Sequence, residues 1–160
     1  MTTERLTFEA ASLDDTARLG SALAEALPSG GILALEGTLG AGKTRLVQCL
    51  AEALGIDPRD VTSPTFVLLQ DYRGRQTIYH LDAYRLRDED ELAELGVDEL
   101  YESGAIVCVE WADRVASSMP HERLQIQIEV TGPDSRTFQL IAHGDKYAAV
   151  LKQLEARLKE

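Results

Sequence analysis

The segment GTLGAGKT, residues 37–44, constrains the fold of this chain more than any other feature. It has the G-x-x-x-x-G-K-[ST] spacing of a phosphate-binding loop. Such a loop needs a strand before it and a helix after it, so that main-chain N–H groups at the helix start converge on an anion. An apolar run at residues 32–36 precedes the segment, and apolar residues at helical spacing follow it as far as Gly55. We therefore expect a strand, a loop and a helix that together bind a nucleotide.

Each residue type in the loop has an expected task. Lys43 is expected to bridge the β- and γ-phosphates, and the Thr44 hydroxyl to bind Mg²⁺. We expect Arg45 to be solvent-exposed, although it adjoins the loop. The expected nucleotide-contacting set is Gly37, Thr38, Leu39, Gly40, Ala41, Gly42, Lys43, Thr44 and Arg45.

Two carboxylates are candidates for managing the metal ion and the attacking water. Glu110 ends an apolar strand expected beside the loop strand, which would place its carboxylate near Mg²⁺. Asp82 ends an alternating strand and could activate water or contact the metal shell. The alternatives are that Glu110 only caps a short helix at residues 112–115, and that Asp82 only pairs with Arg85. The sequence does not rank the two carboxylates for water activation, so the candidate catalytic set is Lys43, Asp82 and Glu110.

Other polar and aromatic residues near these strands have more than one interpretation. Alternation places His80 on the same side of its strand as Asp82, where a structural or a catalytic histidine fits equally. No cysteine or second histidine lies near His80 in the sequence, which argues against zinc. Trp111 either packs in the core, lies against the site or serves a protein contact. The turn holding Ser63, Pro64 and Thr65 either senses the γ-phosphate or only enters a strand.

The remaining pattern predicts an α/β fold: a three-layer, phosphate-loop NTPase-like domain with a mixed parallel and antiparallel sheet, spanning residues 1–160. Apolar runs with few alternations favour buried parallel strands, and alternating runs favour antiparallel ones. A capping box at Ser12 and Asp15 opens the first helix. The expected strands are residues 5–10, 32–36, 65–72, 76–82, 105–110, 123–130 and 136–142. The expected helices are residues 12–27, the segment after the loop, residues 88–95 and a closing helix through Leu158.

Composition limits the function classes. A net charge of −11 opposes binding of a nucleic-acid backbone over a broad surface and suits docking onto a basic protein. No apolar run approaches the length that crosses a bilayer, and the N-terminus lacks a secretory signal, so we expect a cytoplasmic protein with no membrane contact. Cys49 and Cys108 lie in apolar stretches and are expected to be buried, reduced thiols.

Four motifs occur in one order: GTLGAGKT, SPTF, HLDAYRL and EW. In this combination and chain length the sequence resembles the TsaE family, bacterial ATPases of tRNA threonylcarbamoyladenosine formation. The resemblance implies ATP and Mg²⁺ as ligands, TsaB and TsaD as partners, and tRNA contact only through that assembly. It associates Thr44 and Glu110 with Mg²⁺ and makes Asp82 necessary for hydrolysis. Preference for ATP over GTP rests on this likeness.

Three positions carry less defined implications. Thr38 stands where the family commonly has aspartate, which leaves the role of that side chain open. Thr16 and Arg136 match recurrent family positions, with nucleotide contact and a surface role as equal alternatives. Two other functions also stay open: a small-molecule kinase, disfavoured by the sparse arginines around residues 73–87, and a nucleotide-binding module with little turnover.

Overall fold

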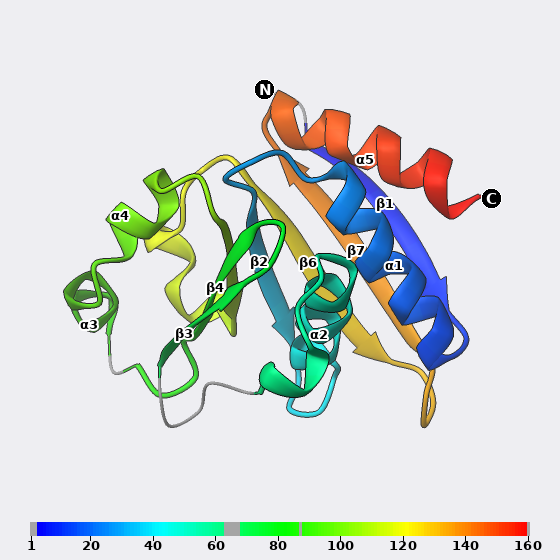
Figure 1. Ribbon diagram of the computed structural model, residues 1–160, viewed down its shortest axis with the longest axis horizontal. Helices are drawn as coiled ribbons and strands as arrows, with labels where there is room; N and C mark the ends of the chain where they lie inside the picture. Colours follow the sequence, from blue (N-terminus) through cyan, green and yellow to red (C-terminus); the bar gives the residue numbers. More distant parts are fainter. Residues whose placement is uncertain (1–2, 63–67, 87, 160) are drawn as a thin grey trace.

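The described residues, 3–62, 68–86 and 88–159 of a computed structural model, form a seven-stranded sheet in the order β1-β7-β6-β2-β5-β4-β3 (Figure 1). β6, β2, β5 and β4 run parallel, whereas β7, β1 and β3 pair antiparallel with their neighbours. The sheet is therefore mixed, as predicted. The strands are β1 (Thr3–Ala10), β2 (Ile32–Gly37), β3 (Leu69–Arg73), β4 (Thr77–Asp82), β5 (Ile106–Glu110), β6 (Arg123–Val130) and β7 (Arg136–His143).

Helices cover the two faces of the sheet unequally. One face carries α1 (Leu13–Ala26), α2 (Lys43–Ala53) and α5 (Asp145–Leu158), which lie in front of the sheet in Figure 1. The other face carries α3 (Glu89–Glu94), α4 (Val97–Glu102) and the 3₁₀ segment η2 (Ala112–Ser118). A short 3₁₀ turn, η1 (Pro58–Asp60), follows α2. The expected three layers are thus present, with one hydrophobic cluster on each side of the sheet.

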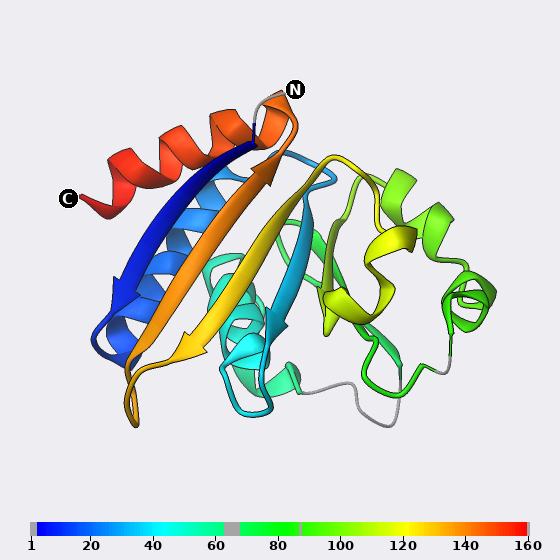
Figure 2. The same ribbon diagram turned by 180° about the vertical axis from the view of Figure 1, so that it is seen from behind.

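The second layer stops halfway across the sheet. Its cluster contains residues of β2, β4 and β5 but none from the described parts of β1, β6 or β7. Seen from behind, no described helix crosses the blue, orange and yellow strands β1, β7 and β6 (Figure 2). That open face is polar: Gln125 and Gln127 donate amide hydrogen bonds to Glu36, and Thr7 donates to Gln139. An antiparallel sheet can remain wet on one side in this way.

The first helix begins with the expected residues but not with a complete capping box. The Ser12 hydroxyl accepts the Asp15 N–H at 3.3 Å, as an N-cap should. The Asp15 carboxylate accepts the N–H of Ala11 rather than that of Ser12. The two capping residues were therefore predicted correctly, but the Asp15 carboxylate bonds to the residue before the N-cap instead of to the N-cap itself.

Two chain segments differ from the sequence prediction or extend it. The acidic helix ends near Gly96 as expected, but the chain then forms the second short helix α4, which periodicity did not reveal because it is only six residues long. β5 ends at Glu110 because Trp111 adopts a left-handed φ of 59° and turns the chain into η2. Cys49 and Cys108 are both buried, as predicted, and neither forms a disulfide bond. In the part of the chain that is described, no helix is long and apolar enough to span a bilayer.

Candidate active site

The loop at residues 37–44 follows β2 and leads into α2, as its spacing predicts. Gly37 is required by close packing: a Cβ there would lie 2.9 Å from the carbonyl oxygen of Ile128 on β6. Gly42, the residue before α2, has a left-handed φ of 110°, which glycine adopts at little cost. The loop is thus pressed against β6 and bent at its end, so that the start of α2 faces the cavity described below.

Lys43 is drawn back into the loop. Its Nζ donates hydrogen bonds to the carbonyl oxygens of Gly37 at 2.7 Å and Thr38 at 2.9 Å. The same ammonium lies 3.8 Å from the ring centroid of Trp111, a cation–π contact. Burial lowers the pKa of Lys43, while the nearby charges of Glu110 and other acids oppose that effect. The lysine is a buried cation placed where an anion would improve its solvation.

Glu110 is the centre of a buried hydrogen-bonded chain. Its Oε2 accepts a hydrogen bond from the Thr44 hydroxyl, with 2.7 Å between the two oxygens, and lies 2.5 Å from Nε2 of His80. The other ring nitrogen of His80 is 2.9 Å from the hydroxyl of Tyr72, which in turn donates to Gln70. Burial raises the pKa of Tyr72 to about 12, so this hydroxyl keeps its proton at neutral pH. The chain fixes the Glu110 carboxylate beside the Thr44 hydroxyl.

Asp82 lies directly opposite Glu110 because β4 and β5 are parallel and in register at their carboxyl ends. Its Oδ1 accepts the Tyr84 N–H at 2.8 Å, and its side chain is buried. Burial raises the pKa of Asp82, the Tyr84 N–H lowers it, and the charge of Glu110 raises it further. A carboxyl whose pKa is raised toward neutrality has the property expected of a group that accepts a proton from water.

These groups face one cavity of about 470 Å³. Its lining consists of loop residues 39–45 together with Asp82, Tyr84, Arg85, Glu110 and Trp111. Volume does not single it out, because a hollow of about 590 Å³ adjoins it on the open side of the sheet. What distinguishes it is that a lysine, a hydroxyl and two buried carboxylates meet at one edge. That edge holds the carboxyl ends of the parallel strands, where α/β sheets bind ligands.

Trp111 contacts two neighbours that the sequence did not suggest. Its ring lies 3.8 Å from the Lys43 ammonium, and the ring of Tyr84 is tilted against it at 43° with the centroids 4.8 Å apart. Tyr84 is 43% exposed, so these contacts reach from the buried lysine to the protein surface. Trp111 lines the cavity and also packs against the second hydrophobic cluster, so both positions considered for it within the fold are observed, while a protein contact stays a prediction.

Several sequence predictions have a definite structural position. Arg45 is exposed, as expected, while it still lines the cavity. Glu110 does not cap the following helix: the N-cap residue of η2 is Trp111, and no side-chain hydrogen bond caps this end. Thr16 is buried in α1, and its hydroxyl has no partner within the described part of the chain. Ser63, Pro64 and Thr65 of the SPTF motif lie outside the described residues.

Arg136, the first residue of β7, contacts the loop from behind. Its Nε donates to the carbonyl oxygen of Ala41 at 2.7 Å, and it is not among the described residues that line the cavity. Arg136 is half-buried and contacts the main chain of the loop, a role that neither reading included; its contact with the nucleotide stays a prediction.

Sequence reasoning missed Tyr72 as a neighbour of the site. The signal was present, because Tyr72 pairs with Ile78 across the β3–β4 hairpin and so lies diagonal to His80 on the same face. The sequence also showed no cysteine near His80. In the sheet, however, Cys108 of β5 lies directly opposite His80 of β4. Across residues 3–62, 68–86 and 88–159, even so, no group of three or more His, Cys, Asp and Glu side chains is arranged to hold a metal ion.

Comparisons with known proteins agree with one another. The family model for threonylcarbamoyl adenosine biosynthesis protein TsaE matches residues 10–138. A Bacillus subtilis protein named tRNA threonylcarbamoyladenosine biosynthesis protein TsaE is 38% identical, over 94% of each chain. The protein of the same name from Treponema pallidum is 40% identical, over 78% of this chain and 92% of its own. The crystal structure of B. subtilis YdiB superposes with a TM-score of 0.81 at 31% identity, covering 98% of this chain and 97% of that one.

Proposed function

Because the chain belongs to the TsaE family, we propose that it hydrolyses ATP, with Mg²⁺, as a component of tRNA threonylcarbamoyladenosine biosynthesis. The observation that carries this proposal is the meeting of Lys43, Thr44, Asp82 and Glu110 at one cavity. A binding module would need the lysine and the loop but not two buried carboxylates. The paired carboxylates therefore favour hydrolysis over binding alone.

The residues present fit both ATP and Mg²⁺. Among the residues that the structure describes, the Lys43 ammonium is hydrogen-bonded to two carbonyl oxygens and lies against a ring, so a phosphate would supply a directly bound negative charge. Thr44 and Glu110 offer oxygen ligands, which Mg²⁺ prefers. The absence of a three-residue metal cluster in the described chain agrees with a magnesium ion that takes most of its ligands from phosphate and water. Bound Mg²⁺ would neutralise charge that develops on the transferring phosphoryl group.

We assign the protein groups as follows. The loop N–H groups and Lys43 bind and orient the triphosphate. Thr44 and Glu110 hold the metal, and the His80–Tyr72 chain keeps the Glu110 carboxylate in place. Asp82 accepts a proton from the attacking water, since its raised pKa and its position opposite Glu110 suit that task. Water activation thereby goes to Asp82, and metal binding to Glu110.

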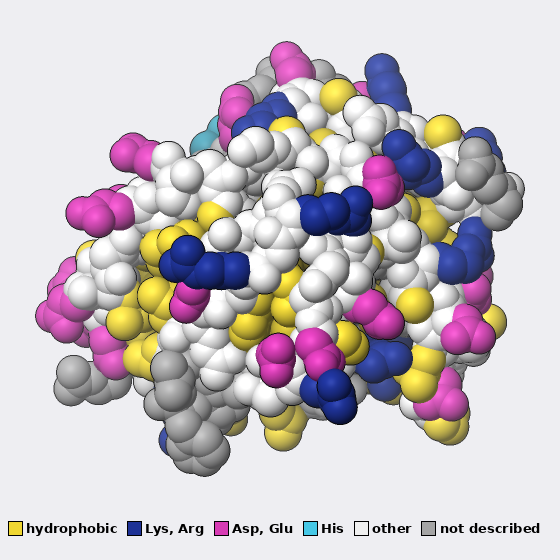
Figure 3. All heavy atoms as spheres, viewed as in Figure 1, with side chains coloured by type: hydrophobic (Ala, Val, Ile, Leu, Met, Phe, Trp, Pro, Cys, Tyr) yellow, Lys and Arg dark blue, Asp and Glu magenta, His cyan; other side chains and the backbone are white. Residues whose placement is uncertain are grey.

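TsaB and TsaD are the proposed partners, with tRNA contacted only through their assembly. The surface charge agrees with a protein partner: acidic side chains gather over α3 and α4 at the left of Figure 3, whereas lysine and arginine are scattered. Such a surface repels a phosphate backbone and attracts a basic protein face.

The deciding experiment measures phosphate release from ATP by the protein alone, by the TsaB and TsaD pair alone, and by the three together. We expect release that needs all three and Mg²⁺. Transfer of the γ-phosphate to a small molecule would indicate a kinase instead. Tight Mg-ATP binding without release in any mixture would indicate a binding module.

A further inference from the structure

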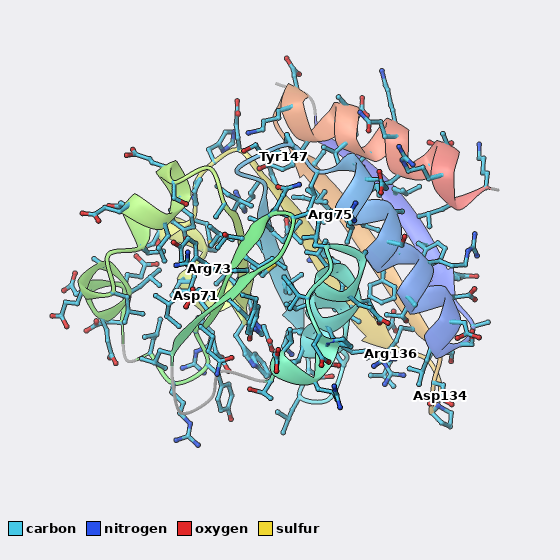
Figure 4. The ribbon with its side chains drawn as sticks, viewed as in Figure 1. Asp71, Arg73, Arg75, Asp134, Arg136 and Tyr147 are labelled. Carbon is cyan, nitrogen blue, oxygen red and sulfur yellow. The ribbon has the colours of Figure 1, made fainter. Side chains whose placement is uncertain are left out.

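Arg136 joins two loops that are distant in sequence. One is the phosphate loop, where its Nε donates to the Ala41 carbonyl at 2.7 Å. The other is the β6–β7 hairpin, where its NH1 donates to the carbonyl oxygens of Gly132 at 2.9 Å and Ser135 at 2.7 Å. Figure 4 shows Arg136 near the start of α2, with Asp134 at the hairpin tip. The guanidinium thus clamps the phosphate loop to the main chain of the hairpin.

The bond to Ala41 fixes the direction of the next N–H group. The peptide between Ala41 and Gly42 is trans, so its carbonyl and its N–H point in opposite directions. Arg136 holds the carbonyl on the β7 side, away from the cavity that Ala41 and Gly42 line. The N–H of Gly42 is therefore turned away from Arg136 and toward the phosphate site.

The local sequence does not hold this peptide in place by itself. Rotating a peptide plane changes ψ of the residue before it and φ of the residue after it. Gly42 follows the plane, and glycine adopts both signs of φ at similar cost, so its observed value of 110° is not locked. An external restraint is needed if the N–H is to point in one direction before the nucleotide arrives.

We propose that Arg136 is a positioning residue for the phosphate loop: by holding the Ala41 carbonyl, it orients the Gly42 N–H toward the phosphates of the nucleotide. This inference rests on the proposed nucleotide binding. Arg136 touches no reacting atom, so it acts on binding and leaves the chemical step alone. Pre-orientation stabilises the complex by removing an ordering cost.

The test compares Arg136→Gln and Arg136→Lys with a matched control, Arg123→Gln. Arg123 is likewise the first residue of a strand, β6, and likewise donates to main-chain carbonyls, those of Pro120 and His121. We expect the Kd and KM for Mg-ATP to rise about tenfold in Arg136→Gln, the effect of one lost charged hydrogen bond. kcat in the full mixture should stay within about twofold of wild type. Arg136→Lys should recover part of the affinity, and Arg123→Gln should match wild type.

A second measurement works without nucleotide. The Gly42 amide signal in ¹⁵N–¹H spectra should shift or broaden in both Arg136 variants and remain unchanged in Arg123→Gln. Wild-type affinity with an unshifted Gly42 signal in Arg136→Gln overturns the inference, and so does a lower kcat at unchanged Kd. If wild type itself binds no Mg-ATP, the proposed function fails; the Gly42 signal then still decides whether Arg136 orients this peptide.

Discussion

The sheet has a parallel half, β2, β5 and β4, and a half that we call antiparallel, β1, β7 and β6, in which β6 pairs antiparallel with β7 and parallel with β2. The two halves differ in what covers them and in what they bury. β2, β5 and β4 are covered on both faces, and their carboxyl ends hold the buried side chains of Asp82 and Glu110. β1, β7 and β6 are covered on one face, and their other face carries a hydrogen-bonded polar layer (Figure 2). Charged groups are costly to bury, so a protein keeps them dry only where they serve a purpose. The contrast agrees with the proposed site in the parallel half, for which the antiparallel half would be the support.

Support here has a concrete meaning. β6 lies against the loop at Gly37, and the hairpin that joins β6 to β7 carries the Arg136 clamp. The antiparallel half thus contacts the phosphate loop from outside the cavity. Substitutions at matched residues of the two halves test this difference.

The largest effect is expected at Asp82. Asp82→Asn should lower the rate of ATP hydrolysis in the full mixture by about 10²–10⁴-fold, because the water loses its proton acceptor. The Kd for Mg-ATP should change little, since Lys43 and the loop remain. Asp71→Asn, on the exposed strand β3, is the matched control and should hydrolyse ATP at the wild-type rate. Hydrolysis by Asp82→Asn at that same rate would remove Asp82 from the mechanism.

The next effect concerns the covered face of the antiparallel half. Phe138→Ala on β7 should lower the free energy of unfolding by about 3–5 kcal/mol, because it leaves a cavity in the core, where Phe138 packs against Phe8 of β1. Gln139→Ala, the next residue on the open face, should cost no more than about 0.5 kcal/mol. Denaturant unfolding measures both. Equal losses would mean that the open face is covered in solution.

A smaller effect is expected from His80 and Tyr72, the hydrogen-bonded residues behind Glu110. Tyr72→Phe keeps the ring but removes the hydroxyl that contacts His80, at a cost to stability of about 1 kcal/mol. The Mg²⁺ concentration for half-maximal hydrolysis should rise about tenfold, as when a residue behind a metal ligand is lost. Tyr79→Phe, on the opposite face of β4, is the control. An unchanged Mg²⁺ requirement in Tyr72→Phe would show that the chain does not position Glu110.

The smallest effect is a dependence of stability on pH. Burial raises the pKa of Asp82 above its ordinary value of 3.8. Between that value and the raised pKa, the folded state keeps a proton that the unfolded state releases, so stability falls as pH rises through this interval. Asp82→Asn lacks the effect and should therefore gain on wild type as pH rises from 3 to 7. Parallel pH profiles of the two proteins would show that the pKa is not raised.

The parts that the sequence predicted are those set by neighbouring residues. The phosphate loop, the strand before it and the helix after it follow from spacing within about twenty residues. Alternation also placed His80 and Asp82 on one face, and strand ends placed both carboxylates at one edge. Each inference needed only strand periodicity and the rule that parallel strands end together.

The parts that the sequence did not reveal depend on contacts across the fold. Arg136 and Ala41 are 95 residues apart, and the pairing of β7 with β6 and of β6 with β2 brings them together. The contacts of Trp111 with Lys43 and Tyr84 depend on the left-handed turn at Trp111, for which the residue type gives no signal. The sequence also did not reveal that the rear face of β1, β7 and β6 is uncovered. Alternation shows that one side of a strand is polar, but not whether a helix covers that side.

The two buried cysteines provide a way to measure how often the centre of the sheet opens. Cys108 lies in β5 opposite His80, fully buried, and burial raises the pKa of its thiol; Cys49 lies buried in α2. A thiol reagent can react with Cys108 only when the strands around the carboxylates separate. The labelling rate of Cys108 in a Cys49→Ala protein would therefore measure the rate at which the strands at the centre of the sheet separate. A lower labelling rate in the presence of Mg-ATP would measure how far a bound ligand stabilises the closed state.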